Sequence, residues 1–137
     1  MQCLFCLIIA GEIPCQNVYE DENTFAFLDI GPVSEGHTLV VPKVHTNDLA
    51  SGSLEAAQQI MTTVYRIAPA ILRAVGADGY NLGMNHGESA GQDVVHTHIH
   101  IMPRTTGVPR TFTKTHPSNE ELAATAEEIR VELQKVG

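Results

Sequence analysis

Three histidines, His96, His98 and His100, occupy alternate positions in the segment that reads HTHIHIMPR over residues 96–104. In extended backbone, alternate side chains point to the same face, so a regular strand would gather three imidazoles. Three interpretations compete: a solvated polar strand face, a three-histidine metal centre for hydroxide chemistry, and a histidine nucleophile that its neighbours tune.

The three-histidine metal centre is the hardest to build, because the first and third residues of such a strand stand about 14 Å apart. Imidazole is mostly neutral at pH 7, attacks phosphorus or acyl carbon and leaves again, provided that a fixed partner holds its second ring nitrogen. The preceding loop favours this nucleophilic interpretation. Gly91-Gln92-Asp93 offers backbone N–H groups to an anion, Gly87 and Gly91 allow close approach, and Asn85 adds an amide.

Hydrophobic periodicity and capping residues predict the elements that hold these residues. We expect strands over residues 17–19, 24–28, 38–41, 80–85 and 98–102. A short buried helix is expected over residues 4–10, and a long helix that Ser53 caps should run to Val75 with a kink at Pro69. A C-terminal helix should begin at Ser118 with a Ser118–Glu121 capping box. This alternation predicts an α+β domain on a mainly antiparallel sheet.

Length and composition narrow the class of protein. The 137 residues suit one domain over 1–137, and the formal net charge of −8 argues against a polymeric nucleic acid as partner. A small nucleotide is still compatible, because histidines and backbone N–H groups can hold one phosphate locally. We find no signal peptide and no stretch of transmembrane length, so we expect a cytoplasmic protein without a membrane partner and with reduced cysteines.

The histidine segment resembles the His-φ-His-φ-His-φ-φ signature of the histidine triad (HIT) family, with Thr97 in a slot that is usually apolar. Three further segments resemble family segments in order and spacing: Leu28–Ile30, Gly36–Lys43, and the N-terminal residues Cys3–Cys6 with Gly11–Pro14. The resemblance covers residues 3 to about 104. It implies a five-stranded, mainly antiparallel sheet with one long helix and a C-terminal helix, and a homodimer in which two such sheets join.

The resemblance also implies an activity. Members are nucleotide hydrolases or transferases, and the middle histidine, here His98, would attack the α-phosphorus to form a nucleotidyl-histidine that water cleaves. His100 and His37 would support this step, and catalysis would need no cofactor. The expected substrates are purine nucleoside phosphoramidates or related adenylated compounds. Dinucleoside polyphosphate hydrolysis and nucleotide-dependent regulation with little turnover are the alternatives.

Nucleotide contacts follow from the same resemblance. Asn85, Gly91 and Gln92 map onto phosphate and leaving-group contacts, and Asp29 maps onto the ribose contact, with a turn-forming role as its alternative. The base pocket would comprise Leu4, Phe5, Ile8 and Ile30, for which plain core is the alternative. Asp93 departs from the family pattern, which often has Ser or Thr there. We expect its carboxylate to turn away and bond a backbone group rather than to stay protonated beside the phosphate.

The cysteines predict a metal site. Cys3-x-x-Cys6 is half of a zinc site, and the resemblance to bacterial members completes it with His45 and His96. Four protein ligands leave no position for water, so the zinc would be structural. A zinc-bound His96 cannot share a face with the other two triad histidines, and the strand must therefore be irregular at His96 or begin after it. Cys15 lies outside this pattern and is interpreted as a small hydrophobic residue.

Overall fold

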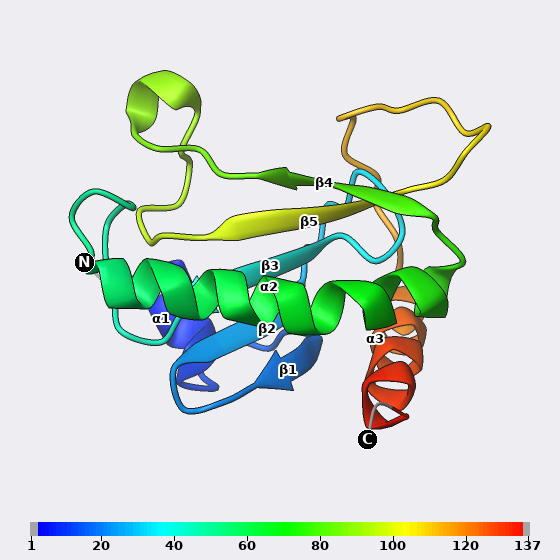
Figure 1. Cartoon of the computed structure of the whole chain (residues 1–137), viewed down its shortest axis with the longest axis horizontal. Coiled ribbons are helices and arrows are strands. Elements are labelled where there is room, and N and C mark those ends of the chain that lie inside the picture. The colour runs from blue at the N-terminus through cyan, green and yellow to red at the C-terminus, as the bar shows by residue number, and fades with distance from the viewer. Residues whose placement is uncertain (1–2, 136–137) are drawn as a thin grey trace.

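The computed structural model describes residues 3–135, which form one five-stranded antiparallel sheet in the order β1-β2-β3-β5-β4 with three α-helices (Figure 1). The strands are β1 (Asn17–Glu20), β2 (Thr24–Leu28), β3 (Thr38–Pro42), β4 (Gly79–Gly83) and β5 (Ile99–Arg104), and the helices are α1 (Leu4–Ile9), α2 (Leu54–Val75) and α3 (Asn119–Gln134), with one 3-10 turn, η1 (Glu88–Ala90). The predicted architecture is confirmed.

Two apolar clusters occupy the two faces of the sheet. Every residue of β2 and β3 is buried, as expected of central strands that are covered on both faces. The larger cluster lies under α2 and α3 and includes Val40, Ile67 and Ile101. The smaller cluster lies on the opposite face, where α1 contributes Phe5 and Ile8. Because α1 is short, much of that second face remains available for a binding site.

The two long helices follow their capping signals. The Ser53 hydroxyl accepts from the Ala56 N–H at 3.0 Å, and Gly76 ends α2 in the left-handed conformation at φ +71°. The Ser118–Glu121 capping box is present at the start of α3. Leu122, Ala126 and Ile129 of α3 belong to the larger cluster. Val136, which continues the apolar spacing of this helix in the sequence, lies outside the described residues.

Several strand boundaries differ from the prediction by one or two residues. Strand β4 ends at Gly83 rather than at Asn85, and β3 includes Pro42 as its last paired residue, opposite Thr24. Proline is tolerated there because a terminal strand position need not donate a ladder hydrogen bond. Strand β5 begins at Ile99 rather than at His98 and extends to Arg104. The helix α2 runs through Pro69 without interruption, and the predicted kink stays a prediction.

The start of β5 has a physical reason that bears on the site. The Thr97 N–H donates to the Thr46 carbonyl at 2.8 Å, in the loop before α2, instead of to the neighbouring strand. The chain therefore joins the sheet only at Ile99. Ile99 and Ile101 face the larger cluster, so His98, His100 and Met102 face the opposite side. Among residues 3–135, no helix is long and apolar enough to cross a membrane.

Candidate active site and metal site

A cavity of about 640 Å³ lies on the α1 face of the sheet and contains most of the predicted site residues. His37, His98 and His100 form part of its wall, and Leu4, Phe5 and Ile8 from α1 form the apolar end. The remaining predicted residues along its wall are Asp29, Ile30, Asn85, Gly91 and Asp93. The cavity thus brings together segments from both ends of the chain, and Gln92 is the one predicted nucleotide-binding residue that does not line it.

Hydrogen bonds fix the tautomers of two histidines in the wall. The Val33 N–H donates to His37 Nδ1 at 3.1 Å, so a neutral His37 carries its proton on Nε2. This Nε2 lies 2.8 Å from His100 Nδ1, to which it donates. A neutral His100 is then left with its own proton on Nε2, ready to donate to a substrate oxygen or leaving group.

His98 has the opposite tautomer. Its buried ring places Nδ1 2.7 Å from the carbonyl oxygen of His96, which can only accept, so Nδ1 carries the proton. Nε2 then keeps its lone pair, which is the form that a nucleophile requires. Phe5 packs edge-on against the ring with a centroid separation of 5.0 Å and restrains its orientation.

Burial holds the rings of His37 and His100 in the neutral form. Burial is the main cause that lowers the pKa of His100 to about 4, and the neighbouring His37 and His98 rings contribute in the same direction. Burial also lowers the pKa of His37, against the opposing carboxylate of Asp29, whose Oδ2 lies 3.7 Å from His37 Nε2. Near neutral pH, the His37–His100 pair is therefore a chain of neutral hydrogen bonds rather than a pair of charges.

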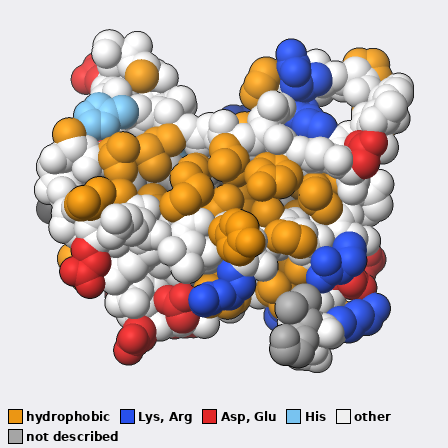
Figure 2. All heavy atoms as spheres, in the orientation of Figure 1, with side chains coloured by type: hydrophobic (Ala, Val, Ile, Leu, Met, Phe, Trp, Pro, Cys, Tyr) orange, Lys and Arg blue, Asp and Glu red, His pale blue; other side chains and the backbone are white. Residues whose placement is uncertain are grey.

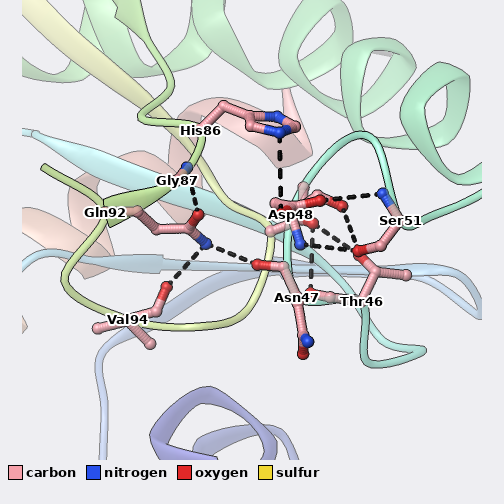
Figure 3. Close-up of polar contacts among 9 residues, drawn as sticks. Thr46, Asn47, Asp48, Ser51, His86, Gly87, Gln92 and Val94 are labelled. Carbon is pink, nitrogen blue, oxygen red and sulfur yellow. Dashed lines mark hydrogen bonds and ion pairs between the residues drawn. The ribbon is translucent and has the colours of Figure 1, made fainter. Parts of the chain in front are cut away.

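The loop between β4 and β5 supplies the wall opposite α1. Gly91 has φ +92°, a conformation that favours glycine, and its carbonyl accepts from the Asn85 amide at 3.3 Å. The N–H groups of Gly91 and Gln92 donate to Glu88 and Gly87 carbonyls within the loop. Figure 3 shows that the Gln92 side chain points to neighbouring loop segments, where it bonds backbone groups of Gly87, Val94 and Asn47.

The backbone hydrogen bond expected of the Asp93 carboxylate is not found among residues 3–135. Asp93 is one of the residues that line the cavity. The nearby N–H groups of Gly91 and Gln92 are already used inside the loop, which leaves few donors for it. The negative charge of Asp93 makes a small contribution that opposes the burial lowering the pKa of His100.

The cavity also contains residues that the sequence did not point to. Phe27, Leu39 and Met102 stand on strand positions that face α1, a signal that alternation along these strands could have supplied. Phe112 and Lys114 come from the irregular segment after β5, where no periodic pattern exists.

The segment after β5 is fastened at both ends of its crossing over the cavity. The Arg104 guanidinium donates to the Thr111 carbonyl at 2.8 Å and lies 5.0 Å from the centre of the Phe112 ring. The Thr115 N–H and hydroxyl both donate to the Pro32 carbonyl, at 2.9 and 2.7 Å. Lys114 is the one lysine or arginine among the described residues of the cavity wall.

The four predicted metal ligands lie together beside the cavity. One ligand atom from each of Cys3, Cys6, His45 and His96 lies within 4.8 Å of the others. Cys3 Sγ is 3.4 Å from His96 Nδ1, and Cys6 Sγ is 3.3 Å from His45 Nδ1. The ring of His96 is therefore turned away from the other triad histidines, as the irregular start of β5 allows.

A hydrogen bond at Nε2 of each histidine orients its Nδ1 toward the metal cluster. His96 Nε2 lies 2.9 Å from the Pro42 carbonyl, and His45 Nε2 lies 2.8 Å from Asn47 Oδ1. Both Nε2 atoms thus donate, which leaves the Nδ1 lone pairs directed at the cluster. Burial lowers the pKa of His96 and raises that of Cys6, so the imidazole is ready to ligate whereas the thiol must lose a proton. The donor set fits tetrahedral zinc.

Asp29, His37 and His100 form a second cluster of ligating atoms. The Val33 N–H occupies His37 Nδ1, and the Nε2 proton of His37 occupies His100 Nδ1. Without lone pairs directed at a shared centre, this group is a hydrogen-bonded chain rather than a metal site.

Comparison with known proteins decides the family, because the model of the HIT domain matches residues 10–107. The chain belongs to the HIT family. The protein named Protein hit of Bacillus subtilis is 50% identical over 102 residues, which cover 74% of this chain and 70% of that protein. The crystal structure of a zinc-bound histidine triad family protein from Mycobacterium smegmatis has a TM-score of 0.90 and 39% identity, covering 99% of this chain and 96% of that one.

Two relatives in the HIT family have names that state an activity. The adenosine 5'-monophosphoramidase hnt1 of Schizosaccharomyces pombe is 36% identical over 137 residues, covering 98% of this chain and 100% of that protein. The adenylylsulfatase HINT3 of Arabidopsis thaliana is 44% identical over 102 residues, which cover 74% of this chain and 52% of that protein. Both names describe cleavage of an adenylyl compound.

Proposed function

We propose that this HIT protein is a nucleotide hydrolase that cleaves the bond between the α-phosphorus of a purine nucleotide and its leaving group, with a nucleoside phosphoramidate as the preferred substrate class. One observation carries the proposal: the His98 Nδ1 proton is committed to the His96 carbonyl at 2.7 Å, so that Nε2 offers its lone pair on the cavity wall. The names of the two adenylyl-cleaving relatives support this class of chemistry.

The reaction would proceed in two displacements. His98 Nε2 attacks the α-phosphorus, a P–N bond to the histidine forms, and the bond to the leaving group breaks as that group takes up a proton. Water then attacks the nucleotidyl-histidine, the P–N bond breaks, and the nucleoside monophosphate leaves with His98 restored. The His96 carbonyl stabilises the positive charge that the His98 ring carries in the intermediate. The Nε2–H of His100 can donate a hydrogen bond to a phosphoryl oxygen or to the leaving group, and the proton that the leaving group takes up comes from water.

The apolar end of the cavity would hold the base. Leu4 and Ile30 are 45% and 78% exposed although both line the cavity, so neither serves as plain core. Phe5 and Ile8 are buried and belong to the smaller cluster, and they would serve both packing and binding. Asp29 accepts from the Gly31 N–H through Oδ1 at 2.8 Å, which leaves capacity on Oδ2 for a ribose hydroxyl.

Dinucleoside polyphosphates are a second substrate class, and Lys114 is the reason to keep it. This cation lies on the wall of a cavity whose other charged residues are the carboxylates Asp29 and Asp93. An ammonium group there would favour a substrate that carries phosphates beyond the first. The positive charge of Lys114 would also help a protein with a net charge of −8 to accept an anionic ligand.

We also propose that Cys3, Cys6, His45 and His96 hold a structural zinc ion. When bound, zinc would cross-link the start of α1 to the segments on either side of the cavity, and its four protein ligands would leave no position for catalysis. No step of the reaction involves it.

A homodimer is proposed on the exposed face of α2 and on the free edge of β4. Leu54, Met61 and Tyr65 stand on one face of α2, and Tyr80 and Leu82 on β4 are likewise exposed. Figure 2 shows hydrophobic side chains gathered across the face on which α2 and β4 lie. Because β4 is at the end of the sheet order, a second copy could continue the sheet there.

A substrate panel tests the proposed activity. Purified protein is incubated with an adenosine phosphoramidate, a dinucleoside polyphosphate and a nucleotidyl sugar, and release of AMP is followed. We expect the highest kcat/KM for the phosphoramidate and no release with His98→Ala. Saturable AMP binding without turnover of any substrate would instead identify a regulatory nucleotide-binding protein.

A further inference from the structure

The side chain of Gln92 links two loops that are far apart in the sequence. Its Nε2 donates to the Asn47 carbonyl at 2.6 Å and to the Val94 carbonyl at 3.1 Å, and its Oε1 accepts from the Gly87 N–H at 2.8 Å (Figure 3). The Gln92 N–H also donates to the Gly87 carbonyl at 3.1 Å. The amide is thus fully engaged with backbone, and one of its partners lies in the loop before α2.

That loop, over residues 43–53, contains the proposed metal ligand His45. Asn47 follows His45 by two residues, and its Oδ1 lies 2.8 Å from His45 Nε2, while His45 Nδ1 faces the cysteines. Asn47 therefore contacts the metal ligand through its side chain and Gln92 through its backbone carbonyl. A continuous hydrogen-bonded path connects the four-ligand cluster to the loop over residues 85–93 that walls the cavity.

A weaker contact joins the same two loops. His86 Nε2 lies 3.8 Å from Asp48 Oδ2, a contact that Figure 3 marks with a dashed line. Hydrogen bonds from Ser51 lower the pKa of Asp48. Both side chains are accessible to solvent, so this pair contributes little by itself. The Gln92 amide, with bonds to three backbone groups, is the main connection.

We propose that Asn47 and Gln92 form a bridge through which the Cys3–Cys6–His45–His96 site holds the phosphate-facing loop 85–93 in place. Gln92 is then a positioning residue and not a contact of phosphate or leaving group. Metal binding fixes His45, His45 fixes Asn47, and the Asn47 carbonyl holds the amide that sets the distance between Gly87 and Val94. Loss of metal would loosen a loop that contains none of the ligands. This inference rests on the fit of the four ligands to a metal and not on the proposed hydrolase activity.

Amide hydrogen exchange of the full-length protein tests the bridge without any substrate. Peptides over residues 85–93 are followed with zinc bound and after chelation, and peptides over β2 report global unfolding. In the wild type we expect chelation to speed exchange in 85–93 by about tenfold while β2 stays protected, because two side-chain hydrogen bonds lose their fixed partner. In zinc-bound Gln92→Ala the same peptides should already exchange at the faster rate, and chelation should add little.

Two further variants keep the test decisive. Asn47→Ala retains the backbone carbonyl but removes the Oδ1 bond to His45, so zinc-bound Asn47→Ala should loosen 85–93 even if the chelated wild type unfolds altogether. Gln58→Ala on α2 is the matched control, because among the described residues the Gln58 side chain makes no hydrogen bond, and its exchange should equal that of the wild type. Unchanged exchange of 85–93 in zinc-bound Asn47→Ala and Gln92→Ala would overturn the bridge.

Gln92→Glu separates a bridge from a space-filling role. The substitution keeps the size of the side chain and the acceptor for the Gly87 N–H, but it removes both N–H donors and places a charge against two carbonyls. The bridge predicts that Glu loosens the loop at least as much as Ala, and a Gln92→Glu protein with wild-type exchange would contradict it. A changed ratio of kcat/KM between two leaving groups, with normal exchange, would instead make Gln92 a leaving-group contact and also overturn the proposal.

Discussion

Acidification should destabilise this protein through His100, whose ring is held neutral in the folded state. Its pKa is about 4 when folded, against 6.5 for an ordinary exposed histidine. Between these two values the unfolded chain binds a proton that the folded chain does not bind, so stability falls as the pH falls through this window. Above about pH 7 His100 is unprotonated in both the folded and the unfolded chain, and this loss of stability vanishes.

The size of the penalty follows from the same two values. At pH 5 a fully shielded ring with this shift would lose about 2 kcal/mol of folding free energy relative to pH 7.5. Since the His100 side chain is only partly buried, solvent screening reduces the expectation to about 1–2 kcal/mol. Replacement by Asn keeps an acceptor for the His37 Nε2 proton and removes the titration.

Urea unfolding at pH 7.5 and pH 5.0, with zinc in excess, measures this contribution. The wild type should lose about 1–2 kcal/mol more than His100→Asn between the two pH values, and the pH dependence of the metal site cancels in the difference because both proteins share it. Equal losses in the two proteins would refute the argument that burial and the His37 contact keep His100 neutral.

Four further changes should give distinct results. Cys3→Ser should abolish stoichiometric zinc in elemental analysis and lower the Tm; an unchanged Tm would exclude a structural zinc. Lys114→Ala should raise KM for a dinucleoside polyphosphate about tenfold but leave KM for a phosphoramidate nearly unchanged, and equal effects on both would remove the case for the second substrate class. Asp93→Ser should alter turnover, since the carboxylate lines the cavity and raises the pKa of His100; identical turnover on every nucleotide would show that Asp93 does not act on the site. Tyr65→Arg, at a side chain that is 84% exposed, should convert a dimer into a monomer in sedimentation without loss of fold, and an unchanged mass would move the interface elsewhere.

Local signals were sufficient where local physics determines the structure. The Ser53 cap, the Gly76 stop and the Ser118–Glu121 capping box are short-range hydrogen-bond and backbone effects, and the structure has all three. Strand β2 was predicted to the residue because its apolar run is bounded by an acidic turn.

The features that the sequence did not predict depend on hydrogen bonds between residues that are far apart in the chain. Strand β5 begins at Ile99 because Thr97 bonds a loop carbonyl at Thr46, 51 positions away. Phe112 and Lys114 reach the cavity because Thr115 hydrogen-bonds their segment to Pro32. No periodic pattern in the sequence predicts this contact. The cluster of Cys3, Cys6, His45 and His96 could be predicted only by joining a local Cys-x-x-Cys pair to the family resemblance, since Cys6 and His96 are 90 positions apart.

The covalent intermediate is the most direct test of the account. Protein is mixed with an adenosine phosphoramidate, quenched within milliseconds to seconds under conditions that preserve P–N bonds, digested and examined by mass spectrometry. The account predicts an adenylyl group on His98, absent from His98→Ala, that appears before free AMP accumulates. AMP release by the wild type without any modified histidine, or an adenylyl group on His100 instead, would contradict it.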